Sequence, residues 1–129
     1  MTIGVIAAME LELENLLPAM EQVERETVSG ITFYKGKAFG KEIVAAVCGI
    51  GKVFAAMCAQ TMILRYQPDC IVNLGVAGSL LPDLHVFEIV AAEQLCQHDM
   101  DTSALGDPVG LVSGINRVYF PADETMVHL

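Results

Sequence analysis

The feature that most constrains the fold is a continuous apolar run at residues 2–8 (TIGVIAA), which passes directly into the polar segment MELELEN. A run without polar alternation is typical of a strand that is covered on both faces. The pattern returns at residues 69–78 (DCIVNLGVAG), where an apolar run leads into a glycine loop. Because 53% of the residues are apolar and only 18% are charged, the chain has enough apolar side chains to cover both faces of such a sheet.

Helical spacing replaces the strand pattern after residue 8. Apolar side chains recur there every three or four residues and form one stripe of an amphipathic helix: Met9, Leu13, Leu16, Leu17 and Met20. Pro18 is expected to bend or shorten this helix, because proline has no N–H to donate. A second helix is predicted over residues 51–67, which follow a glycine turn and stop before Pro68.

The remaining elements are mostly strands. Between the two helices the sequence predicts an antiparallel meander, with turns at Ser29-Gly30 and Gly40-Lys41. Strands are predicted over residues 23–29, 31–39 and 41–49 in this meander, and over residues 86–99 and 115–120 later in the chain. A last helix is predicted over residues 121–129, with Pro121 and Asp123 as its opening signals. This order of elements predicts an α/β fold with a mixed sheet, in a single domain spanning residues 1–129.

Charge and cysteine spacing exclude several functions. The net charge is −9 and no cluster of Lys or Arg occurs, which argues against nucleic acid as a partner. No apolar stretch reaches the length of a membrane span. The four cysteines form no C-x-x-C pair, a pattern that favours buried thiols in the cytoplasm over disulfides or a zinc site.

Three segments are candidates for a functional site. The glycine turns CGIGKV (48–53) and LGVAGSL (74–80) both follow strands, and ligands of open α/β sheets bind beyond the carboxyl ends of strands. Among the three glutamates after the first strand, Glu14 lies far from the apolar stripe, whereas Glu10 and Glu12 flank it. Either flanking carboxylate is able to reach a ligand. The run HDMD (98–101) offers metal ligands, although a solvated loop is the favoured interpretation.

Together these motifs resemble one family. The segments IGVIAAMELE, CGIGKV, VNLGVAGSL and QHDMDTSALGDP occur in the order and spacing of the bacterial 5′-methylthioadenosine/S-adenosylhomocysteine nucleosidases, within the purine nucleoside phosphorylase superfamily. The resemblance implies a three-layer α/β/α fold with a mixed central sheet, a homodimer, and no metal or other cofactor. It also implies hydrolysis of the N-glycosidic bond of the nucleoside substrates 5′-methylthioadenosine and S-adenosylhomocysteine, with release of adenine, in methionine salvage.

The resemblance also implies roles for individual residues. Glu12 matches the carboxylate that activates the attacking water. The substrate-binding positions of the family match Met9 beside the ribose, Ile50 in the pocket for the 5′-thio substituent, and Val76, Ala77 and Gly78 along the ribose and base. Thr102 and Leu105 match positions that close the 5′ pocket of the partner subunit.

The chain departs from the family pattern in its loops and in its length. Ser79 replaces a glycine, and Phe87 stands where a glycine is usual, so that strain is expected at Phe87 if the backbone there has positive φ. The chain corresponds to the N-terminal half only, so weak or no turnover is expected from it alone. Two alternatives stay open: a nucleoside phosphorylase, disfavoured because no arginine stands near the glycine loops, and a non-catalytic nucleoside-binding module.

Overall fold

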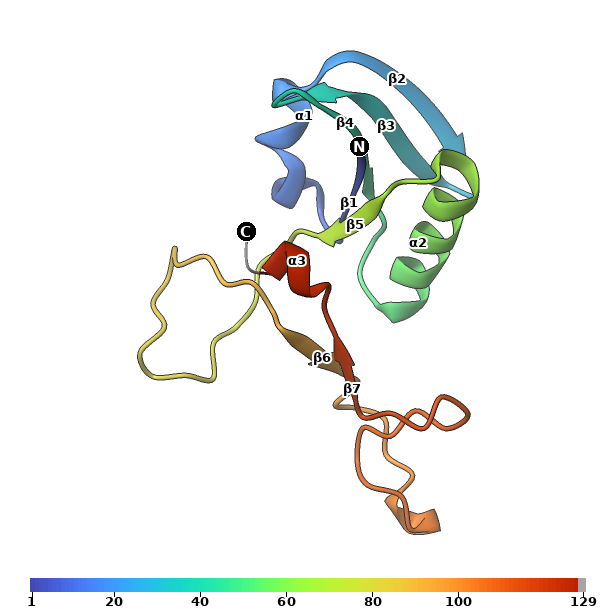
Figure 1. Cartoon of the computed structure of the whole chain (residues 1–129), viewed down its shortest axis with the longest axis vertical. Coiled ribbons are helices and arrows are strands. Elements are labelled where there is room, and N and C mark those ends of the chain that lie inside the picture. The colour runs from blue at the N-terminus through green and yellow to red at the C-terminus, as the bar shows by residue number, and fades with distance from the viewer. Residues whose placement is uncertain (128–129) are drawn as a thin grey trace. The chain divides into compact units, whose positions relative to one another are not determined.

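The computed structural model describes residues 1–127. The chain divides into two units, Met1–Gly78 and Ser79–Leu129, which are treated separately below. In Figure 1 the first unit runs from blue to green and the second from yellow to red. Within residues 1–127, none of the helices is both long enough and apolar enough to cross a bilayer.

The first unit is built on a mixed sheet of five strands, as the sequence predicted. The strands are β1 (Thr2–Ala7), β2 (Glu21–Val28), β3 (Ile31–Ala38), β4 (Lys41–Val47) and β5 (Cys70–Asn73), in the spatial order β2-β3-β4-β1-β5. β1 pairs in parallel with both β4 and β5, whereas β2, β3 and β4 form the antiparallel meander. The carboxyl ends of β4, β1 and β5 therefore meet at one edge of the sheet.

Both turns of the meander are two-residue turns with positive φ at each central residue. Ser29 and Gly30 have φ of 52° and 81°, and Phe39 and Gly40 have φ of 52° and 71°. This geometry matches the right-handed twist of paired strands. The second turn was predicted one residue too late, because Lys41 already belongs to β4.

The predicted first helix is the main error in this unit. One turn of 3₁₀ helix (η1, Glu10–Leu13) and one turn of α-helix (α1, Leu16–Ala19) replace a continuous helix. Pro18 supplies the physical reason, since it cannot donate to the carbonyl of Glu14 and its ring would crowd that carbonyl. The prediction that the apolar stripe is buried holds for part of it. Leu13 and Met20 are buried, whereas Met9 is exposed.

The second predicted helix is confirmed. α2 spans Lys52–Tyr66 and ends at Gln67, which adopts a left-handed conformation with φ of 48°. Its buried side chains, Cys58 and Met62, pack onto the sheet, and Gly4 leaves room there for the sulfur of Met62.

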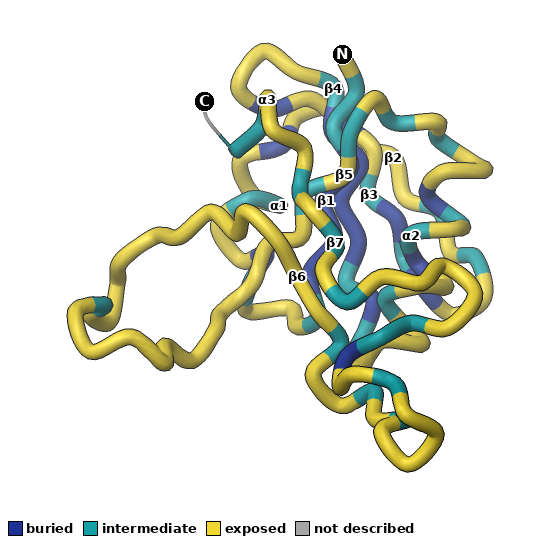
Figure 2. The backbone as a smooth tube through the Cα atoms, turned by 60° about the horizontal axis from the view of Figure 1, so that its bottom comes forward, coloured by how far each residue is buried: buried dark blue, intermediate teal, exposed yellow. Residues whose placement is uncertain are grey.

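Side chains from both faces of the sheet form a three-layer core. On the α2 face, Ile6, Phe33 and Val44 pack with Cys58 and Met62. On the opposite face, a second cluster joins the sheet to η1 and α1: Val5, Ala7, Leu13, Met20, Ala38, Ile43 and Ala45. Neighbouring residues of β1 and β4 thus point to opposite layers, as their unbroken apolar runs predicted. In Figure 2 the buried backbone follows these strands.

The second unit contains little regular structure. Its elements are β6 (Gln94–Cys96), η2 (Ser103–Leu105), β7 (Tyr119–Pro121) and α3 (Glu124–Val127), and β6 pairs with β7 in antiparallel fashion. The strands predicted over residues 86–99 and 115–120 are therefore mostly wrong. A strand needs a neighbour for its hydrogen bonds, and Phe87 and Ile89 are 100% and 99% exposed.

The last helix keeps one of its two predicted signals. Asp123 accepts hydrogen bonds from the N–H groups of Thr125 and Met126, as an N-cap does, whereas Pro121 belongs to β7. The end of this predicted helix, His128 and Leu129, lies outside the described residues.

Strain was expected at Phe87 if its backbone had a positive φ, and the structure shows that it does. Its φ is 76°, a region that costs a bulky side chain of order 1 kcal/mol or more. No buried hydrophobic side chain occurs between residues 79 and 127, so nothing in this unit offsets that cost by packing.

Candidate active site

Three loops gather at the edge where the parallel strands end. They follow β1, β4 and β5, which are direct neighbours in the sheet. Backbone hydrogen bonds align the strand ends, because the Cys48 N–H donates to the Ala7 carbonyl at 2.8 Å and the Leu74 N–H donates to the Ile6 carbonyl at 2.9 Å. The loops are residues 8–12, 48–51 and 74–78, which contain both predicted glycine turns. This is the position at which open α/β sheets bind ligands.

The Glu12 carboxylate joins two of these loops. Its Oε2 accepts hydrogen bonds from the N–H groups of Ala8 and Met9, at 2.8 and 2.9 Å. Its Oε1 accepts a hydrogen bond from the Val76 N–H at 3.2 Å, across 64 positions of sequence. The hydrogen bond from the Met9 N–H is part of a capping box: Met9 is the N-cap of η1, and Glu12, the third residue of η1, accepts from its backbone. One side chain thus closes its own turn and holds the β5 loop.

The hydrogen bonds keep Glu12 ionised and leave one acceptor position open. The Met9 N–H, followed by those of Val76 and Ala8, lowers the pKa of Glu12 below its ordinary value, against a partial desolvation that acts in the other direction. Each carboxylate oxygen accepts about two hydrogen bonds. Oε2 already accepts two and Oε1 accepts one, so Oε1 is the oxygen with a lone pair available to a water molecule.

The other two glutamates take no part in this arrangement. Glu10 and Glu14 are both exposed, whereas Glu12 is half-buried between the strand ends. The helical-wheel argument placed Glu10 and Glu12 symmetrically about the stripe. The 3₁₀ turn removes that symmetry, because it directs only Glu12 back toward the end of β1.

The other predicted site residues of this unit lie on the same three loops. Met9 is in the first loop, Ile50 in the second, and Val76, Ala77 and Gly78 in the third. Ile50 and Val76 are 75% and 79% exposed, which leaves apolar side chains uncovered on the loops that follow the strands. An apolar wall next to one ionised group suits a ligand that is partly apolar.

Cys48 begins the second loop and is a poor nucleophile there. Burial raises the pKa of its thiol, and the negative charge of Glu12 acts in the same direction. Its Sγ donates a hydrogen bond to the Gly49 carbonyl at 3.1 Å. Because the thiolate is the reactive form, this environment keeps Cys48 inert. The cysteines are unpaired, and Cys48 and Cys58 are buried as predicted, but Cys96 is exposed.

Thr102 and Leu105 belong to the second unit. The Thr102 hydroxyl donates to Oδ2 of Asp107 at 2.9 Å, which anchors the turn around η2. Leu105 is 83% exposed at the end of that turn. Its side chain is therefore presented outward on an ordered turn.

The HDMD segment forms a local turn. Asp101 accepts a hydrogen bond from the Ser103 N–H at 2.9 Å, and hydrogen bonding by Ser103 lowers the pKa of Asp101. Within residues 1–127, no group of three or more His, Cys, Asp or Glu side chains is arranged to hold a metal ion.

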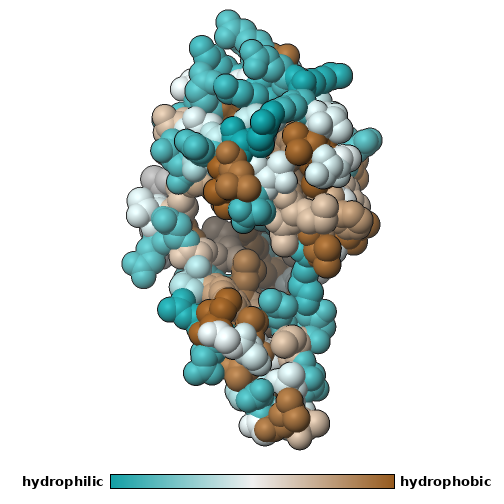
Figure 3. Space-filling model, turned by 90° about the vertical axis from the view of Figure 1, so that its right-hand side faces the viewer, coloured by the Kyte–Doolittle hydropathy of each residue, from teal (hydrophilic) through white to brown (hydrophobic). Residues whose placement is uncertain are grey.

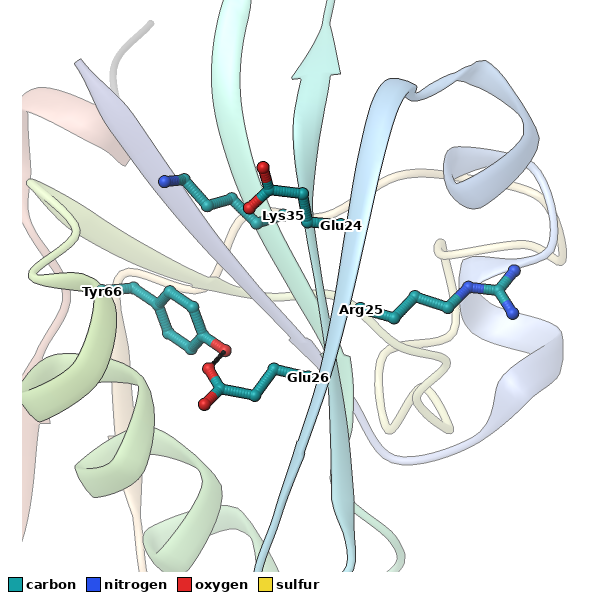
Figure 4. A pocket seen from close by; sticks show the side chains of 5 residues that line it. All are labelled: Glu24, Arg25, Glu26, Lys35 and Tyr66. Atoms are coloured by element: carbon teal, nitrogen blue, oxygen red, sulfur yellow. Dashed lines mark hydrogen bonds between the residues drawn. The ribbon is translucent and has the colours of Figure 1, made fainter.

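A shallow pocket of about 250 Å³ lies at the other end of α2, against the edge strand β2. Figure 4 shows the Tyr66 hydroxyl pointing at Glu26, to which it donates at 2.8 Å, while Arg25 points away from them. Arg65 also pairs with Glu26. These contacts fasten the end of α2 to β2, and we assign them a structural role.

The fold and the three loops define an α/β protein with a candidate ligand site at the carboxyl ends of parallel strands. The chain belongs to the phosphorylase superfamily, whose family model matches residues 2–129.

Relatives and solved structures agree on this family. The chain is 37% identical over 121 residues to the 5′-methylthioadenosine/S-adenosylhomocysteine nucleosidase of Shewanella pealeana, a stretch that covers 94% of this chain and 53% of that protein. A nucleosidase of that name from Neisseria meningitidis, in complex with methylthio-immucillin-A, superimposes with a TM-score of 0.93 at 35% identity, covering 98% of this chain and 55% of the other. The nucleosidase of that name from Colwellia psychrerythraea, in complex with adenine, superimposes with a TM-score of 0.94 at 34% identity, covering 99% of this chain and 52% of the other. The chain thus spans about half the length of the proteins it matches.

Proposed function

We propose that this chain provides the water-activating part of a nucleosidase that hydrolyses the N-glycosidic bond of 5′-methylthioadenosine and S-adenosylhomocysteine. The observation that carries the proposal is the Glu12 carboxylate, which backbone N–H groups hold ionised at the strand ends. The relatives that share about a third of its residues are nucleosidases of this name, and solved neighbours bind adenine or a methylthio inhibitor. The chain is proposed to be the N-terminal part of one nucleosidase domain.

In the proposed reaction, Glu12 Oε1 accepts a hydrogen bond from a water molecule and directs its oxygen to the anomeric carbon. The bond from that carbon to the adenine nitrogen breaks, and adenine leaves with the electron pair. Glu12 takes one proton from the water as the new carbon–oxygen bond forms and afterwards releases it to solvent. The leaving adenine takes up one proton from solvent, so that substrate and water give adenine and the free sugar. General base catalysis of this kind typically contributes 10²- to 10⁴-fold in rate.

The loop residues around Glu12 suit this substrate. Met9 and Ile50 are apolar and exposed, as contact with a ribose face and a thioether requires. Val76, Ala77 and Gly78 allow the backbone of the third loop to approach the sugar and the base.

Hydrolysis is favoured over phosphorolysis by the positions of the arginines in Met1–Gly78. Arg65 is paired with Glu26 at the far end of α2. Arg25 lies over the Tyr34 ring, 5.3 Å from its centroid. Arginine is over-represented where phosphate is bound through two parallel hydrogen bonds, and both arginines of this unit are engaged away from the Glu12 loops. Lysine also binds phosphate, and Lys52 directly follows the second loop, so the phosphate dependence of adenine release decides between the two reactions.

A homodimer is part of the proposal, with Thr102 and Leu105 closing the partner's pocket. The outer side of α2 carries exposed apolar side chains: Val53, Phe54, Met57, Ile63 and Leu64. Figure 3 faces this side of the first unit and shows hydrophobic surface there. A helix with apolar side chains on its outer face is normally covered by another surface. We propose the cytoplasm as the location, in keeping with the free thiols.

Adenine release from 5′-methylthioadenosine tests the function. The chain alone is expected to give weak or no turnover. A chimaera of residues 1–129 with the remaining part of the Shewanella pealeana relative is expected to release adenine at a rate independent of phosphate. In the chimaera, Glu12→Gln is expected to lower kcat by about 10²- to 10⁴-fold, whereas the matched exposed variant Glu14→Gln leaves it unchanged. Retention of most activity in Glu12→Gln contradicts the assignment, and a requirement for phosphate would indicate a phosphorylase.

Oligomeric state is tested separately by light scattering on the same chimaera. A dimer is expected for the parent and a monomer for Leu64→Glu, because a charge on the outer face of α2 would have to be desolvated in the interface. A parent that runs as a monomer would refute the dimer.

A further inference from the structure

Gly75 stands so close to the Glu12 carboxylate that a side chain at this position would make an unusually tight contact with it. A Cβ added at Gly75 would lie 3.0 Å from Glu12 Oε1, 3.5 Å from its Cδ and 3.9 Å from Oε2, and these are its three nearest neighbours. The carboxylate therefore packs directly against the Cα of the β5 loop. No sequence motif singled out this glycine, because LGVAG offers two and the pattern does not say which contacts an acid.

The backbone conformation of Gly75 does not account for the glycine. Gly49 and Gly51 have φ of 92° and 111°, which other residues rarely adopt. Gly75 has no such positive φ, so a left-handed backbone is not the reason for a glycine here. An alanine would instead press on the Glu12 carboxylate, which would have to move by a few tenths of an ångström.

We propose that Gly75 is the positioning residue for Glu12: without a side chain, it lets Oε1 reach the Val76 N–H and so fixes the oxygen that orients the attacking water. The role in orienting water rests on the proposed function, whereas the positioning of the carboxylate does not.

A small displacement is sufficient to break the arrangement. At 3.0 Å the neighbour of a new Cβ must move by a few tenths of an ångström. The bond from the Val76 N–H to Oε1 is already 3.2 Å long, near the upper limit for such bonds. Since Val76 follows Gly75 directly, we expect a displacement of Oε1 away from residue 75 to lengthen this bond. The two bonds to Oε2 come from Ala8 and Met9, on the far side, and they remain.

The first test compares Gly75→Ala with Gly78→Ala by NMR on the 129-residue chain without substrate. Gly78 lies in the same loop, and a Cβ added there meets no atom within 4 Å. In Gly75→Ala, the pKa of the Glu12 carboxyl, assigned by its loss in Glu12→Gln, is expected to rise toward its ordinary value. Exchange of the Val76 amide hydrogen is expected to accelerate about tenfold. Gly78→Ala leaves both unchanged. An unchanged Glu12 pKa in Gly75→Ala overturns the proposal.

A double-mutant cycle covers the case in which Gly75→Ala folds poorly. Because the nearest atoms to the added Cβ all belong to Glu12, the loss of stability caused by Gly75→Ala should largely disappear in a Glu12→Ala background. An equal loss in both backgrounds would show that Gly75 acts through other contacts and would refute the positioning role.

The two proposals can fail separately. Suppose that the double-mutant cycle and the NMR results are as expected, but the Glu12→Gln chimaera still releases adenine at nearly the parent rate. The role of Glu12 as the water-activating base is then refuted, and the positioning of the carboxylate by Gly75 stands. If Glu12→Gln abolishes release but Gly75→Ala moves neither the pKa nor the Val76 amide, the further inference is wrong and the proposed function stands.

Discussion

Removal of the Glu12 carboxylate is expected to destabilise the first unit by an amount that the hydrogen bonds predict. Glu12→Ala leaves the N–H groups of Ala8, Met9 and Val76 without their acceptor. The bond from Ala8 is partly buried, whereas those from Met9 and Val76 are exposed, so water replaces the carboxylate at the latter two. A bond to a charged group contributes about 1.5 kcal/mol or more when water is excluded, and exposed bonds contribute a few tenths. The expected loss is about 2 kcal/mol.

Glu12→Gln separates the shape of the side chain from its charge. The amide oxygen can still accept from Ala8 and Met9, but the NH₂ group then faces the Val76 N–H, donor against donor. Since the bond lost is the exposed one, the expected cost is smaller, about 1 kcal/mol. Urea unfolding followed by circular dichroism at neutral pH should therefore rank the wild type above Glu12→Gln and Glu12→Gln above Glu12→Ala. Glu14→Gln, at an exposed position two residues away, is the control.

The pH dependence gives the sharper check. Because the pKa of Glu12 is lowered on folding, its stabilising effect is fully present above the ordinary value of 4.5 and is lost as the pH falls through the lower, folded value. The difference between the wild type and Glu12→Gln should therefore shrink in acid. If all variants unfold with the same free energy at neutral pH, or if the difference persists unchanged in acid, the described hydrogen bonds do not hold Glu12.

Three further predictions concern the frame of the first unit. Gln67→Gly should raise the urea midpoint, with a gain of about 0.5–1 kcal/mol, because Gln67 ends α2 in a left-handed conformation that glycine adopts without strain; an unchanged or lower midpoint would contradict this. Gly4→Ala should lower the free energy of unfolding by about 1–3 kcal/mol, since the added Cβ would lie 2.5 Å from the buried Met62 Sδ. Partial recovery of stability in a Met62→Leu background would locate the clash, and an unchanged stability of Gly4→Ala would rule it out. Tyr66 should titrate with a pKa of about 12, measured by ultraviolet absorbance. In Tyr66→Phe the pKa of Glu26 should rise toward its ordinary value, because the hydrogen bond from the Tyr66 hydroxyl is the main cause of its lowering. An unchanged pKa of Glu26 would show that this hydrogen bond is not the cause.

The sequence predicted the elements that make their own hydrogen bonds or pair locally. The strands of the meander and α2 were predicted with small errors at their ends, because turn residues, glycine and Pro68 mark where they stop. The prediction of secondary structure failed where a single residue interrupts an element or where a strand has no neighbouring strand. Pro18 divides the first helix although the apolar stripe continues through it.

The strands predicted in the second unit failed for a different reason. Their apolar patterns are suited to a sheet, but Val86 and Ile89 have no adjacent strand within the described residues, and pattern alone does not supply one.

The candidate site was predictable in its chain segments but not in its contacts. Glycine turns after apolar strands indicated the sheet edge, and the family resemblance separated Glu12 from Glu10. The donors to Glu12 are backbone groups, which every residue carries, so that no side-chain pattern marks Ala8 or Val76. Gly75 was hidden for the same reason, since its role is the absence of a side chain.

The three donors that hold Glu12 have a consequence for how this protein is made. All of them lie between Ala8 and Val76, in the unit that ends at Gly78. Synthesis proceeds from the N-terminus, and N-terminal units generally fold first. The carboxylate can therefore reach its final geometry on the ribosome once β5 has joined the sheet, before residues beyond Gly78 have taken their places. Any surface that later closes over the loops meets a carboxylate whose three hydrogen bonds have already formed.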